Sequence, residues 1–165
     1  MTVVEILYYF FMVMAAAGAL AILLSKNVFR SAIYLLVTLL SIAALYVLSF
    51  AEFLAVTQIL IYAGGITVVI IFGIMLTTRM SGKPLVVKNR HVLSGALVGV
   101  SLFILLIKHL PDLSGEAGTL SAEALPVIAV RIFSFYTIPF ELAGLLLLMA
   151  LIGAAVITSH LKSKV

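Results

Sequence analysis

The side chains that could carry chemistry are few, and the most suggestive group lies in one apolar run. Gln58, Tyr62 and Gly65 are spaced by four and three residues, so an α-helix would place all three on one face. An amide and a phenol that faced hydrocarbon would lack partners, so this face is predicted to point into protein. The chemistry available there is hydrogen bonding, either between helices or along a path of water molecules.

Two adjacent glycines, Gly64 and Gly65, lie near the middle of the same run. Glycine lowers the cost of departing from regular helix, which suits a hinge, but small residues also let a neighbouring helix approach closely. The run is long as well, because twenty-five residues at about 1.5 Å each exceed a hydrocarbon core of roughly 30 Å. An inserted residue, as in a π-bulge, would absorb the excess, and such bulges cluster at functional sites.

The carboxylates Glu52 and Glu141 lie near the ends of apolar runs. Pro139 suits a first helical turn, and Glu141 would then complement the positive end of that helix dipole, with a functional carboxylate as the alternative. An ion pathway needs charged or strongly polar groups inside the spans, and the middle of every run lacks charge. We therefore expect no catalytic residue in this chain and no self-contained pump or channel.

The composition fixes the environment of these residues. The 165-residue chain is 65% hydrophobic and 10% charged, with a mean hydropathy of +1.36. A soluble domain has about a quarter of its residues charged, so an ordinary cytosolic enzyme, a disordered tail and a nucleic-acid binder are excluded. The chain has no cysteine, so no thiolate can hold an iron–sulfur cluster or a structural zinc. We expect no metal and no bound cofactor in the chain itself.

Five apolar runs predict an all-α integral membrane protein with five transmembrane helices. A span takes about 20 apolar residues, and in lipid the backbone must satisfy its own hydrogen bonds, which makes these runs helices. We predict a single membrane domain over residues 1–165, an outer loop at 108–139, and a short interfacial helix within 124–136. The predicted spans are residues 3–24, 31–49, 53–77, 92–107 and 140–159.

The basic residues predict the orientation. Eight of the ten lie in the first loop, the third loop and the C-terminal tail, which share one side of the membrane. Positive residues favour the cytoplasmic side, so the N-terminus is predicted outside (periplasmic) and the C-terminus in the cytoplasm of a bacterial cytoplasmic (inner) membrane. The eight are Lys26, Arg30, Arg79, Lys83, Lys88, Arg90, Lys162 and Lys164, and the other two are Lys108 and Arg131.

The third and fifth runs together resemble subunit J of the proton-translocating NADH:quinone oxidoreductase, respiratory complex I. The resemblance rests on residues 58–65, which read Gln-Ile-Leu-Ile-Tyr-Ala-Gly-Gly, and on residues 139–143, which read Pro-Phe-Glu-Leu-Ala. The chain length, the five predicted spans and the long outer loop before the last span also fit. The resemblance covers nearly the whole chain.

This resemblance implies a role in coupling rather than in redox chemistry. In that family the third helix carries a π-bulge that relaxes to α-helix and opens or closes a water path, which would make Tyr62, Gly64 and Gly65 the hinge and Phe72 a moving gate. Gln58, with Glu52 and Glu141, would then line a polar face or water path, and a glutamine there can bond water but cannot hold a proton. The resemblance also implies membrane-arm subunits A, H, K and N and the lipid bilayer as partners, with FMN, iron–sulfur clusters, NADH and a quinone bound elsewhere in the complex.

Two alternatives remain at the level of the sequence. One is a small subunit of a multisubunit cation/proton antiporter or membrane-bound hydrogenase, which have similar short membrane subunits. The other is a purely structural membrane scaffold, in which Tyr62 and Gly65 would matter only for assembly. Co-purification with flavin and NADH oxidation would favour complex I over the first of these.

Overall fold

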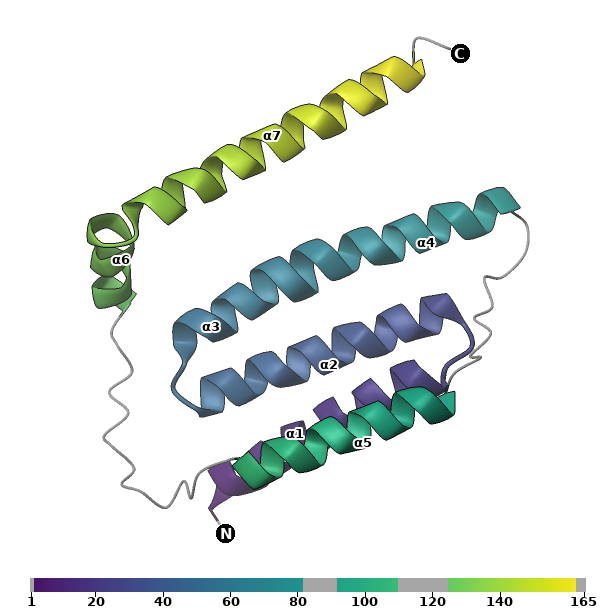
Figure 1. Ribbon diagram of the computed structural model, residues 1–165, viewed down its shortest axis with the longest axis vertical. Helices are drawn as coiled ribbons and strands as arrows, with labels where there is room; N and C mark the ends of the chain where they lie inside the picture. The colour runs from purple at the N-terminus through teal and green to yellow at the C-terminus, as the bar shows by residue number, and fades with distance from the viewer. Residues whose placement is uncertain (1, 82–91, 110–124, 163–165) are drawn as a thin grey trace. The chain divides into compact units, whose positions relative to one another are not determined.

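All the elements in the described part of the chain are helices. The computed structural model describes residues 2–81, 92–109 and 125–162 (Figure 1). The elements are α1 (Val3–Leu24), α2 (Val28–Leu48), α3 (Glu52–Thr57), the π-helix η1 (Gln58–Ile66), α4 (Thr67–Ser81), α5 (Val92–His109), α6 (Leu125–Ser134) and α7 (Thr137–Lys162).

Four of these helical segments are long and apolar enough to cross a membrane, which supports the predicted class. They are Val3–Leu24, Val28–Leu48, Glu52–Thr77, which runs through α3, η1 and α4, and Thr137–Ser159. In α5 the apolar segment Ser94–His109 is shorter than these, so the fifth span and the orientation remain predictions. The short helix expected within residues 124–136 is α6. Residues 82–91 and 110–124, which include most of the predicted third loop and part of the predicted outer loop, lie outside the described residues.

The chain divides into two compact units, Met1–Ala122 and Glu123–Val165. In the first unit α1 packs on α2, and α2 also packs on α3, η1 and α4. In the second unit α6 packs on α7, where the rings of Phe133 and Phe140 meet edge to face with centroids 5.1 Å apart. The single membrane domain over residues 1–165 remains a prediction.

Local capping explains where α1 and α2 begin. At α1 the Thr2 hydroxyl accepts from the Glu5 amide at 3.3 Å, and the Glu5 carboxylate accepts from the Thr2 amide at 2.9 Å, which is a capping box. At α2 the Asn27 side chain accepts from the Phe29 and Arg30 amides. Because Asn27 caps the helix, α2 begins at Val28, three residues before the predicted start.

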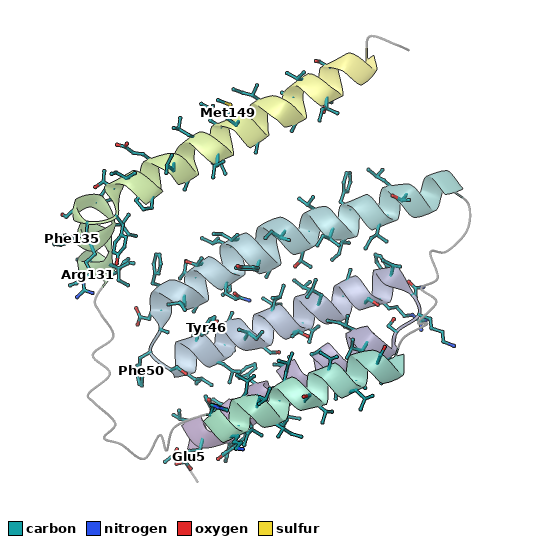
Figure 2. All side chains as sticks on the ribbon, viewed as in Figure 1. Glu5, Tyr46, Phe50, Arg131, Phe135 and Met149 are labelled. Carbon is teal, nitrogen blue, oxygen red and sulfur yellow. The ribbon has the colours of Figure 1, made fainter. Side chains whose placement is uncertain are left out.

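The connection from α2 to α3 is a Schellman motif with an unusual residue. Phe50 has φ of 57°, the left-handed conformation that usually belongs to glycine at this position. The Phe50 amide donates to the Val47 carbonyl at 3.0 Å, and the Ala51 amide donates to the Tyr46 carbonyl at 2.9 Å. Figure 2 labels Tyr46 on α2 and Phe50 in the turn that follows it. These two bonds end α2 and lead the chain directly into the helix that carries the candidate site.

The contact between α1 and α2 depends on a glycine. A Cβ atom at Gly18 would overlap the Thr38 hydroxyl and would lie 3.5 Å from the Tyr34 carbonyl oxygen. The Thr38 hydroxyl donates to that same carbonyl at 2.8 Å, so it is satisfied within its own helix. Close approach at small residues is how membrane helices associate, since lipid provides no hydrophobic drive between them.

Candidate functional site

The helix that runs from Glu52 to Ser81 contains a nine-residue π-helix between its two α-helical parts. Where η1 meets α4, the Thr67 amide donates to the Tyr62 carbonyl, a bond from residue i to residue i−5. The Thr67 hydroxyl donates to the same carbonyl oxygen at 2.7 Å. A π-turn holds one more residue than an α-turn, so η1 lies where the overlong run predicts an inserted residue.

The two adjacent glycines differ in how closely they approach the backbone of η1. A Cβ atom at Gly64 would lie 3.1 Å from the Ile59 carbonyl oxygen, which is tighter than ordinary contact. A Cβ atom at Gly65 would lie 3.6 Å from the Leu60 carbonyl oxygen, an ordinary van der Waals distance. In both pairs the carbonyl belongs to the residue five positions earlier. The π conformation therefore requires a glycine at position 64 more strongly than at position 65.

The π-helix also decides which residues are buried. Gln58 is buried, and the next buried residue is Ala63, five positions later rather than three or four. Burial then continues at α-helical spacing. The buried or half-buried positions along this helix are Ala51, Ala55, Thr57, Gln58, Ala63, Thr67, Ile71 and Ile74. Because α3, η1 and α4 all pack on α2, the step of five keeps both halves of the helix on the same partner.

The predicted polar face is therefore split in this structure. Gln58 is 9% exposed, whereas Tyr62 is 47% exposed and Gly65 is also exposed. The prediction that the three share one face assumed α-helical spacing, and it is wrong for this conformation of the chain; that Tyr62 and Gly65 point into protein stays a prediction, which now concerns a partner subunit. The extra residue in the π-turn moves Ala63 into the place that Tyr62 would occupy in a regular helix.

The remaining predicted residues lie outside η1. Glu52 is in the first turn of α3 and exposed, and Phe72 is in α4 and 58% exposed. Glu141 is exposed and belongs to α7, in the other compact unit. Because α7 begins at Thr137, Glu141 is its fifth residue and lies beyond the first turn, so the expected complement to the helix dipole is not made there.

Two residues that belong to the site, Ala63 and Thr67, were not predicted from the sequence. Neither is notable at α-helical spacing, because each becomes part of the buried face only when a π-turn precedes it. Thr67 is fully buried, and its hydroxyl accompanies the i to i−5 backbone bond. The sequence did contain a signal for these residues. If the expected extra residue is inserted after Gln58, the next position on the buried face moves from Tyr62 to Ala63.

The site contains groups for hydrogen bonding and none for covalent or redox chemistry. The residues of η1 carry no charge, and their polar side chains are the Gln58 amide and the Tyr62 phenol. Among the residues that the structure describes, no three histidine, aspartate or glutamate side chains gather to hold a metal ion. What the arrangement offers is a buried amide, that of Gln58, at the start of a π-helix.

Comparison with known proteins identifies the family. The sequence pattern of NADH-ubiquinone/plastoquinone oxidoreductase chain 6 matches residues 18–157, which include η1 and most of the described helices. The chain belongs to the chain 6 family. The name subunit J, which the resemblance suggested, is the wrong name for this family, although its assignment to the membrane arm of complex I holds.

Relatives of this chain 6 protein occur in cyanobacteria and plastids. NAD(P)H-quinone oxidoreductase subunit 6 of the Chara vulgaris chloroplast is 40% identical over 151 residues, covering 87% of this chain and 84% of the relative. Chain 6 from Synechocystis sp. is 36% identical over 162 residues, covering 91% and 79%. Subunit 6 from the chromatophore of Paulinella chromatophora is 39% identical over 145 residues, covering 85% and 70%.

Proposed function

We propose that this chain is the chain 6 subunit in the membrane arm of a proton-translocating NAD(P)H-quinone oxidoreductase, where it couples quinone reduction to proton movement through its third span. The family match and the names of the relatives support membership in that complex over an antiporter or a hydrogenase. The observation that carries the coupling role is the π-helix at Gln58–Ile66. The chain performs no catalysis by itself, and FMN, iron–sulfur clusters, NADH and quinone are bound by other subunits.

The coupling proposal follows from comparing the two possible registers of this helix. If η1 relaxed to α-helix while α3 stayed in place, the buried face beyond Gln58 would continue at steps of four and three. Each position beyond the π-turn would pass to the residue one place earlier in the chain, so that face would be centred on Tyr62, Ile66, Ile70 and Gly73, all of which are exposed in the π register. They would replace Ala63, Thr67, Ile71 and Ile74 against α2.

A change from the π register to the α register would move the far part of the helix by a defined amount. Removing one extra residue from the helix rotates its far part by about 100° and shifts it by about 1.5 Å. The Tyr62 phenol and the branched side chain of Ile66 would then enter the contact with α2, and the hydroxyl of Thr67 would leave it. Replacing the small side chains of Ala63 and Thr67 by larger ones closes the space in which water beside Gln58 could be held, so the π register is the open state of the proposed gate and the α register the closed one. Quinone reduction elsewhere in the complex biases the choice between them.

The proposal also includes the orientation of the chain in the membrane and its neighbours in the complex. The chain crosses a bacterial cytoplasmic membrane five times, with its N-terminus outside and its C-terminus in the cytoplasm, and contacts subunits A, H, K and N. The distribution of charge supports this orientation. In the α1–α2 pair the acids Glu5 and Glu52 lie at one end of the helices, whereas the bases Lys26 and Arg30 lie at the other.

Two buried alanines give a direct test. Ala55 precedes η1 and Ala63 lies within it, and both are at most 4% exposed. Since the native chain lacks cysteine, Ala55→Cys and Ala63→Cys each supply a single thiol whose labelling by N-ethylmaleimide requires ionisation and therefore water. The intact complex is labelled at rest and during turnover with NADH and a quinone, and this chain is then isolated and its modification measured.

A change of register rotates one half of the helix relative to the other. We expect Ala63→Cys to become labelled during turnover while Ala55→Cys stays protected, or the reverse if α4 is the half that stays in place. A passive scaffold predicts that neither thiol changes. Equal gains at both thiols would indicate general loosening and would also contradict the proposal. Failure of the chain to co-purify with flavin and NAD(P)H oxidation would contradict membership in the complex itself.

A further inference from the structure

The turn between α1 and α2 forms a basic pocket that the coupling role does not use. The pocket has a volume of about 460 Å³ and is lined by Ala21, Leu24, Ser25, Lys26, Asn27, Arg30 and Tyr34. Three of these side chains present polar groups suited to an anion: an ammonium, a guanidinium and a phenol. None of the lining residues is acidic.

The backbone of this turn is already satisfied, so the anion-binding capacity belongs to the side chains. The Asn27 side chain accepts from the Phe29 amide at 3.0 Å and from the Arg30 amide at 3.4 Å. The Ser25 hydroxyl donates to the Asn27 carbonyl at 3.1 Å and accepts from the Asn27 amide at 3.3 Å. Within the described part of the chain neither Lys26 nor Arg30 forms an ion pair, and both are exposed.

The position of the pocket along the helices identifies the kind of anion. α1 has 22 residues and is therefore about 33 Å long, close to the roughly 30 Å hydrocarbon core. The turn that follows Leu24 therefore lies at the level of the lipid head groups. Glu5 is at the opposite end of α1 and Glu52 follows the opposite end of α2, so the carboxylates described in this compact unit are about a membrane thickness away.

We propose that this pocket binds the phosphodiester head group of an anionic phospholipid in the cytoplasmic leaflet. Lys26 and Arg30 neutralise the phosphate, and the Tyr34 hydroxyl donates to one of its oxygens. Arg30 and Tyr34 are four residues apart on α2, which places them on one face. The exposed Leu20 and Leu24 of α1 provide apolar surface on the membrane side of the phosphate, where acyl chains would lie. Basic pockets between membrane helices on the cytoplasmic side bind such head groups. This inference uses the proposed orientation of the chain and is independent of the hinge.

The test uses the intact complex with a photoactivatable phosphatidylglycerol and the matching phosphatidylcholine analogue in vesicles. Cross-linking is read on the peptide that contains residues 21–34 after this chain has been isolated. The variants are Lys26→Gln with Arg30→Gln, the charge-preserving Arg30→Lys, and Lys108→Gln as a matched control that removes a charge outside the pocket. Assembly of each variant complex is checked on a native gel.

The expected results follow from roughly fivefold in affinity for each basic residue near an anionic lipid. Phosphatidylglycerol should cross-link in preference to phosphatidylcholine, and the double variant should need roughly 25-fold more of it for half-maximal labelling. Arg30→Lys and Lys108→Gln should stay close to the unmodified complex. Equal labelling by the two lipids, an unaffected double variant, or no labelling in the assembled complex would overturn the proposal. Displacement of phosphatidylglycerol by an equal concentration of inorganic phosphate would also overturn it, since the pocket would then bind a soluble anion.

Discussion

The two adjacent glycines should have opposite effects when each is replaced by alanine. In the π register a Cβ atom at position 64 would be 3.1 Å from the Ile59 carbonyl oxygen, so Gly64→Ala crowds this register. At position 65 the corresponding distance is 3.6 Å, so Gly65→Ala is accommodated. In the α register Gly65 would lie two turns beyond the buried Gln58 and on nearly the same side of the helix, so there the added methyl would overpack the contact with α2. Gly64→Ala should therefore favour the α register, and Gly65→Ala the π register.

The size of each shift follows from the cost of an extra methyl group. Overpacking a close contact costs about 1–3 kcal/mol, and the small approach needed at Gly64 belongs at the low end of that range. A change of about 1 kcal/mol alters the ratio of two states roughly fivefold. Alanine also has a higher helix propensity than glycine by about 1 kcal/mol, but this applies to both variants and cancels when they are compared.

The register is read by thiol labelling in the intact complex at rest. With Ala63→Cys as reporter, Gly64→Ala should raise the labelled fraction up to fivefold, whereas Gly65→Ala should lower it or leave it unchanged. Proton uptake per NAD(P)H oxidised, measured in vesicles, should fall in both variants because turnover needs both registers. If the two variants shifted the labelling in the same direction, the assignment of one glycine to each register would be refuted.

Three further predictions concern the framework of the site. Gly18→Ala should lower the thermal stability of the complex by the equivalent of about 1–3 kcal/mol because the methyl overlaps Thr38, whereas Gly73→Ala, which meets open space among the described residues, should not. Phe50→Gly should raise stability by about 1 kcal/mol in the same thermal assay, since glycine favours the left-handed position that ends α2, and a decrease would show that the exposed phenyl ring is held by a partner. Thr67→Val loses the hydroxyl bond to the Tyr62 carbonyl that accompanies the π register, so it should weaken that register by about 1 kcal/mol and raise the resting labelling of Ala63→Cys up to fivefold, and unchanged labelling would contradict this.

The described helices were largely predictable because long apolar runs in lipid have one solution. The first predicted span, residues 3–24, has the same limits as α1. The prediction for the last span began at residue 140, after Pro139, but α7 begins at Thr137. Proline is tolerated there because the amides of the first helical turn have no partner within the helix in any case. The capping box of Thr2 and Glu5 was also legible in the sequence and was not used.

The candidate site was predictable in position but not in geometry. Length and paired glycines indicated a bulge near Gly64, and the structure has a π-helix there. The face could not be predicted in the same way, because the spacing of Gln58 and Tyr62 implies a shared face only in an α-helix. Which register forms depends on packing against α2, a contact between segments that the periodicity of one segment does not contain. Glu141 illustrates the same limit, since its place relative to η1 depends on how two compact units meet.

The nature of the α2 contact would keep the two proposed registers close in energy. The fully buried side chains there are small, with Ser41 and Thr67 the largest among the described residues, and their hydroxyls donate to carbonyls of their own helices. Rotation of the third span therefore breaks no interhelical hydrogen bond made by these groups, and lipid provides no hydrophobic penalty for the faces exchanged. The energy difference between the two registers would then depend mainly on steric fit, at the level of single methyl groups. A difference of that size is comparable to the 1–3 kcal/mol by which one site in a protein typically biases another, so a distant reaction could select the register.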